Sequence, residues 1–191
     1  MRRRETLIAA GGIVTVGTGL AALTGDASGQ RLSVESIDVA DATHETKTGE
    51  VYSPWLDLEV SAEWAVNTTP TDVRVMLLVG PRDDRELLQM DTYPVATQES
   101  SGTYQVHGKV IESDHYASDD FDVSEPGGAT TVEIPFAVRV EIRAESETLV
   151  ETTATETATL TVEHTGAEAQ VSVSLSGGVV VQESEDDPRP V

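Results

Sequence analysis

Apolar side chains recur at every second position along most of the chain beyond residue 30. Successive side chains of a β-strand point to opposite faces, so each such run predicts a strand with one buried and one solvated face. No window of ten or more residues carries an apolar stripe at helical spacing. The predicted strands are Leu32–Val39, Leu56–Val66, Asp72–Val79, Glu86–Asp91, Thr103–Ile111, Thr131–Ala144, Leu149–Glu163 (within it Ala154–Val162), Val171–Leu175 and Val179–Gln182.

Turn-forming residues separate these runs. They are Asn67-Thr68-Thr69-Pro70, Gly80-Pro81-Arg82-Asp83-Asp84, Ser100-Ser101-Gly102, Glu125-Pro126-Gly127-Gly128 and Ser176-Gly177-Gly178. Short alternating strands with frequent turns predict an all-β fold, an antiparallel β-sandwich that is most simply immunoglobulin-like or fibronectin-like. We expect Trp64, on an early strand, to fill the space between the two sheets.

One predicted hairpin is longer than the rest. Its arms, Thr131–Ala144 and Leu149–Glu163, join at a charged turn near Glu145-Ser146-Glu147. In the second arm alternate threonines share one face, while Ala154, Ala158, Leu160 and Val162 share the other. The threonine face is a solvated surface, a contact with a neighbouring subunit or a site for O-linked sugar. Pro135, which cannot donate a ladder hydrogen bond, favours an exposed edge there.

The first residues have the layout of an export signal. Arg2, Arg3 and Arg4 precede an uncharged stretch from Thr6 to Gly25, and small residues follow at Asp26-Ala27-Ser28-Gly29. The chain therefore divides into a signal (1–29), one sandwich domain (30–182) and an acidic, proline-containing tail (183–191) that we expect to be disordered.

The paired arginines Arg3 and Arg4 resemble a twin-arginine signal, although Thr6 stands where such signals usually carry a bulky apolar residue. Four glycines weaken the apolar segment 7–23 as a membrane-spanning helix. The alternative is that this segment is not cleaved and anchors the protein to the membrane.

The net charge of the chain restricts the partners and the salt concentration that it suits. Twelve Lys and Arg stand against 34 Asp and Glu, which gives a net charge of −22. Such a chain repels nucleic acid and anionic lipid at ordinary salt. It has no cysteine, which excludes disulfides, a lipid anchor on cysteine and cysteine-type zinc sites. Concentrated salt would screen the self-repulsion. Abundant acid, Thr and Val with only two lysines is similar to exported proteins of haloarchaea, a resemblance of composition that assigns no active-site residue.

Two local patterns suggest binding or modification. Asn67-Thr68-Thr69 is an N-glycosylation sequon in a predicted turn, and Asn67 is the only asparagine of the chain. The segment between two predicted strands holds clustered carboxylates, and such a cluster either supplies oxygen ligands to Ca²⁺ or is a solvated acidic loop. The candidate ligands are Asp114, Asp119, Asp120 and Asp122.

No catalytic motif is present. The histidines at 44, 107, 115 and 164 are scattered, and no glycine-flanked serine elbow occurs. We therefore expect a non-catalytic exported module of the cell surface or envelope, with no cofactor beyond a possible calcium ion. It would act through the loop Asp114–Gly128, the hairpin tip or strand addition at a sheet edge. The alternatives are a subunit of a surface or virus-derived assembly that makes contacts through the hairpin 131–163, and an extracellular hydrolase.

Overall fold

A computed structural model describes residues 24–25, 30–39, 45–46, 55–123, 127–164, 169–175 and 180–182. Apart from Thr24 and Gly25, the predicted signal 1–29 lies outside these residues. The acidic tail 183–191 lies outside them as well.

Two antiparallel sheets pack against each other, which confirms the predicted all-β antiparallel sandwich. The four-stranded sheet has the order β1 (Thr24–Gly25), β2 (Arg31–Val39), β4 (Trp55–Ala65) and β7 (Glu99–Lys109). The seven-stranded sheet has the order β3 (Glu45–Thr46), β10 (Ala169–Leu175), β9 (Glu147–His164), β8 (Ala129–Ala144), β5 (Asp72–Val79) and β6 (Glu86–Pro94), and β11 (Val180–Gln182) also pairs with β9.

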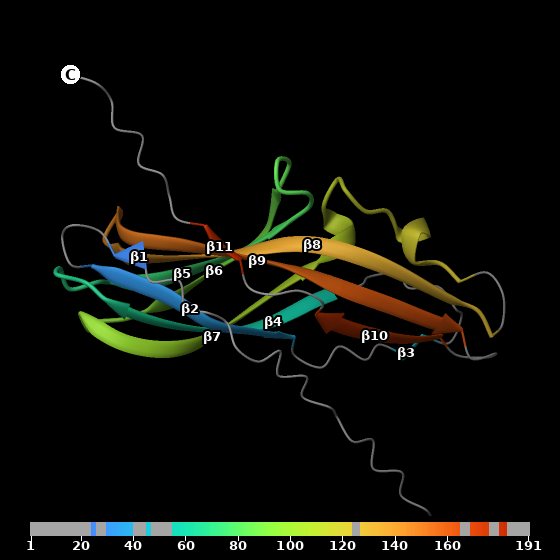
Figure 1. Cartoon of the computed structure of the whole chain (residues 1–191), viewed down its shortest axis with the longest axis horizontal. Helices are drawn as coiled ribbons and strands as arrows, with labels where there is room; N and C mark the ends of the chain where they lie inside the picture. The colour runs from blue at the N-terminus through green and yellow to red at the C-terminus, as the bar shows by residue number, and fades with distance from the viewer. Residues whose placement is uncertain are drawn as a thin grey trace, which may run out of the picture.

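The core lies between the sheets, where β2 faces β9 and β7 faces β5 and β6 (Figure 1). The apolar residues of each alternating run fill it, because period-two alternation puts them all on one face of the strand. Trp64 is only 1% exposed, as expected for the residue that fills the space between the sheets. Its ring nitrogen donates to the carbonyl of Thr97 at 3.2 Å, which satisfies the one polar group of this buried side chain.

The long hairpin is present and extends along the long axis of the molecule (Figure 1). It is not a free arm, because β5 pairs with residues 136–143 of β8 and β10 pairs with residues 158–164 of β9. Pro135 lies where β5 ends: the last β5–β8 pair is Val79 with Phe136, and the Gly80 amide donates to the Pro135 carbonyl at 2.9 Å.

One predicted turn is wrong. Ser100-Ser101-Gly102 lies inside β7 and pairs with residues 62–64 of β4. The composition of the three residues favours a turn, but pairing with a long neighbouring strand overrides that preference. Gly102 has a packing role there, because a Cβ atom at this position would lie 2.8 Å from Cζ of Tyr104.

Candidate functional site

The acidic loop between β7 and β8 is part of the core structure. It contains two short 3₁₀ helices, η1 (Val110–Glu112) and η2 (Ser118–Phe121). Val110 and Phe121 are fully buried in the core. The Tyr116 hydroxyl donates to the Glu133 carbonyl at 3.3 Å, on the stretch of β8 beyond the end of β5. The loop therefore covers an edge of β8 that no strand pairs with in the described part of the chain.

The candidate calcium ligands have local roles in this loop. The Asp114 amide donates to the Glu86 carboxylate at 2.8 Å, and the Asp120 carboxylate accepts from the Ala117 amide at 2.8 Å, at the start of η2. Asp119 and Asp122 are exposed. Among the described residues, no three His, Asp or Glu side chains are placed to hold a metal ion. Asp114, Asp119, Asp120 and Asp122 thus do not form a ligand set in this structure.

Asn67 and the hairpin tip lie at the same end of the sandwich. Asn67 is exposed in the turn between β4 and β5, and its carbonyl accepts from the Gln98 amide at 2.9 Å. In the same connection, the Thr71 amide donates to the Arg143 carbonyl at 2.7 Å, and the Thr71 hydroxyl accepts from the Glu145 amide at 3.0 Å. The hairpin tip is therefore held against the loop before β5, while the sequon remains open to solvent.

The described histidines are not gathered into a catalytic arrangement with one another. The ring of His115 packs on Gly80, whose φ of 114° is accessible to glycine. His107 lies on the outer face of β7, with its ring centroid 5.7 Å from that of Trp55. The side chains of His44 and His164 lie outside the described residues.

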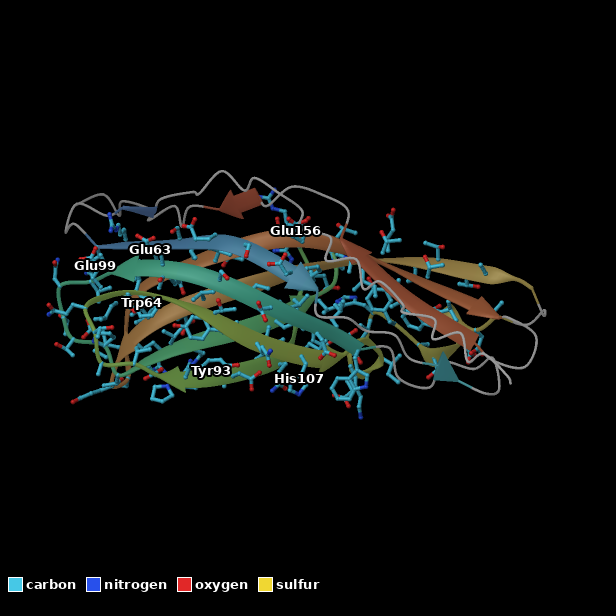
Figure 2. All side chains as sticks on the ribbon, turned by 90° about the horizontal axis from the view of Figure 1, so that it is seen from below. Glu63, Trp64, Tyr93, Glu99, His107 and Glu156 are labelled. Carbon is cyan, nitrogen blue, oxygen red and sulfur yellow. The ribbon has the colours of Figure 1, made fainter. Side chains whose placement is uncertain are left out.

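The two outer faces of the sandwich differ in charge. The face of the four-stranded sheet is acidic, and Arg31 bridges Glu63 at 3.4 Å and Glu99 at 3.2 Å, at the end labelled in Figure 2. Near the other end of this face, the Lys109 ammonium lies 5.1 Å from the centre of the Trp55 ring, a cation–π contact. Carboxylates on this face belong to Glu35, which accepts from the Ser33 hydroxyl, and to Asp38, Asp57, Glu59, Glu63 and Glu99.

On the outer face of the seven-stranded sheet, acid is offset by arginine. Arg74 lies 3.5 Å from Glu141, and Arg143 lies between Glu141 at 4.0 Å and Asp72 at 3.9 Å. Burial raises the pKa of the Glu141 carboxyl, and the positive charge of Arg74 opposes that rise. The network ties β5 to β8 across the sheet.

Beside this network lies an apolar surface, which we call the β6 patch: Met76, Leu78, Leu87 and Met90. Leu87 pairs with Leu78 and Met90 pairs with Met76 across the β5–β6 ladder. Leu87 is 50% exposed and Met90 is 45% exposed, and they are the exposed large apolar side chains of the described residues. Met76 is buried but lies outside the core cluster, as expected for the outer face. Sequence analysis missed the patch, because a bulge at Leu88, between the pairs Leu77–Gln89 and Leu78–Leu87, breaks the alternation in β6.

Sequence analysis also missed a buried carboxylate on β9. Glu156 lies on the core face between Ala154 and Ala158, pairs with Phe136, and is only 8% exposed. It is on the β9 side of the sandwich, away from Tyr93 and His107 (Figure 2). Among the described residues its Oε2 has no hydrogen-bond partner. Burial raises the pKa of this carboxyl, and the Thr157 amide, which donates to it, opposes that rise. The sequence did contain a signal for this burial, because residues 154, 156 and 158 share one face of a strand and both neighbours of Glu156 on that face are alanines.

Comparison with known proteins finds no matching family model, no matching curated protein and no matching solved structure. In the described part of the chain, no helix has the length and apolar character that crossing a membrane requires. The segment 7–23, considered above as an anchor, lies outside that part.

Proposed function

We propose that this protein is a non-catalytic exported β-sandwich that works by contact at the cell surface or in the envelope, in a high-salt environment. The basic start, apolar stretch and small residues at positions 2–29 support export. The net charge of −22 supports concentrated salt, where the Debye length shrinks to about 3 Å at 1 M and like charges on a compact fold repel less.

The β6 patch is the observation that carries the contact role. Leu87 and Met90 are about half exposed on one sheet face of a very acidic protein. Apolar side chains that gather on a solvated surface mark an interaction site more often than apolar residues scattered singly. Burying such side chains in a contact contributes roughly 25 cal/mol per Å² of apolar surface removed from water.

A flat sheet face, and not a loop, is the surface that we propose for the contact. The acidic loop and the hairpin tip, which we expected to bind partners, are held by hydrogen bonds to β8 and to Thr71. The outer face of the seven-stranded sheet keeps Leu87, Met90 and, in part, the threonines of β9 accessible. We therefore assign the contact to a preformed sheet face, which loses little conformational entropy on binding.

A role as a subunit of an assembly is the second candidate. The threonines of β9 that face outward, from Thr153 to Thr161, are half-buried and continue the surface on which the β6 patch lies. In such an assembly, the hairpin would contribute this face and not its strand edges, which β5 and β10 occupy over most of its length.

The proposed location outside the cytoplasm can be tested on the native protein. We expect fractionation of the host to place it outside the cytoplasm, and N-terminal sequencing to find a start near residue 30. An intact N-terminus in the membrane fraction would mean that residues 7–23 remain as an anchor. A cytoplasmic protein that keeps Met1 or Arg2 would contradict the proposal. Turnover in a broad hydrolase screen in molar salt would contradict the non-catalytic assignment.

A further inference from the structure

We propose that the partner of the β6 patch is a second copy of this chain, which docks face to face on the outer face of the seven-stranded sheet. This inference rests on the proposed contact function and names its partner. In this dimer the interface extends across β6, β5, β8 and β9, and the β6 patches of the two copies cover each other.

Charge favours this face over the other. In a face-to-face dimer with two-fold symmetry, each surface meets its own copy, so an unbalanced charge repels itself. On the outer face of the four-stranded sheet, six carboxylates lie on the same surface as Arg31 and Lys109. Among the described outward side chains of β5, β8 and β9 the charges nearly cancel, and several are already paired: Arg74, Arg139 and Arg143 against Asp72, Glu133, Glu141 and Glu151.

The structure of β6 favours docking of two sheets face to face over the joining of two copies at their β6 edges. The β6 edge has a bulge at Leu88, and Pro94 at its end removes one donor. The Glu86 carboxylate and the Tyr93 hydroxyl fasten the two ends of β6 to the acidic loop and to β7. These features disfavour the addition of a further strand, whereas Leu87 and Met90 point away from the sheet.

The area that two copies could bury on this face is small for a specific dimer. β5 has 8 residues, which at about 3.3 Å each give a length of about 26 Å. Four strands at about 4.8 Å give a width of about 19 Å, so each copy contributes about 500 Å² and the dimer buries about 1,000 Å² in total. That value is at the lower limit for a specific interface, and we expect a dissociation constant on the order of 10 µM or weaker.

Sedimentation velocity of the mature protein in molar salt tests the inference. We expect a monomer–dimer equilibrium that Leu87→Glu combined with Met90→Glu weakens at least tenfold. The matched control adds two charges to exposed positions of the other sheet, Thr103→Glu with Gln105→Glu, and should leave the equilibrium unchanged. The β-sheet circular dichroism spectrum should persist in both variants.

Single cysteines give a second readout, because the chain has none of its own. Under a mild oxidant, Leu87→Cys or Met90→Cys should form a disulfide-linked dimer at least ten times faster than Gln105→Cys. A protein that stays monomeric up to about 1 mM overturns the inference, and so does a dimer that is insensitive to the paired glutamates. If a monomer still binds the envelope through the β6 patch, the second copy is the wrong partner and the contact function survives.

Discussion

Replacing the buried Glu156 with glutamine should make the protein more stable at neutral pH. The carboxyl is 8% exposed, lies opposite the fully buried Phe136, and among the described residues offers an Oε2 atom with no partner. Burial disfavours the charged carboxylate more than a neutral amide of the same size, because the charge loses its hydration. Glutamine keeps the shape and can still accept from the Thr157 amide. We therefore expect Glu156→Gln to raise the free energy of unfolding by about 1–2 kcal/mol.

The gain depends on pH in a defined direction. Burial raises the pKa of Glu156 in the folded state above its unfolded value of about 4.3. The charged carboxylate therefore weakens the fold at high pH, and this cost disappears as the pH falls below the unfolded pKa. The advantage of glutamine should be full at pH 7 and small near pH 4. A gain of about 1 kcal/mol corresponds to a rise in Tm of about 2–4 °C for a domain of this size.

Thermal unfolding at both pH values in molar salt measures the effect. The control is Glu59→Gln, an exposed carboxylate on the outer face of β4, which we expect to change the stability by less than about 0.5 kcal/mol. Equal stability of Glu156→Gln and the wild type at pH 7 would refute the reasoning. So would a gain of the same size at both pH values, since that gain would not come from the charge.

Three further predictions test local features. Glu145 has a φ of 55° in the two-residue turn of the hairpin, where glycine is preferred, so Glu145→Gly should raise the unfolding free energy by about 0.5–1 kcal/mol in chemical denaturation. Gly80→Ala should cost about 2 kcal/mol or more, because a Cβ there would lie 2.7 Å from the Asp84 carbonyl oxygen at a φ of 114°; an unchanged Tm would contradict this. Mass spectrometry of the native protein should find a glycan on the Asn67 peptide, and an unmodified peptide would remove the site.

The fold was largely predictable because most strands have one buried face. β5 was predicted with both of its bounds, since its alternating start continues into an apolar run and turn residues flank it on each side. The burial of Trp64 followed from the same pattern. The two-residue strands β1 and β3 were missed, because two residues show no periodicity.

The candidate surfaces were harder to predict, because they depend on the partner that the fold places beside each residue. The number of carboxylates at 114–122 suggested a calcium site. In the structure, the Asp120 carboxylate accepts a hydrogen bond from an amide of its own loop. Leu87 and Met90 resemble core residues in the sequence. Only the bulged pairing with β5 places both of them on the outer face. Tertiary pairing, and not local composition, decided these positions.

The most direct test of the contact function compares retention of the protein at the cell surface. The variant Leu87→Glu with Met90→Glu and the control Thr103→Glu with Gln105→Glu would be produced in the host lacking the native gene. If contact through the β6 patch, with a second copy or with another component of the envelope, holds the protein at the surface, the first protein is released into the medium and the control stays with the envelope. Equal retention of the two folded proteins would contradict the account.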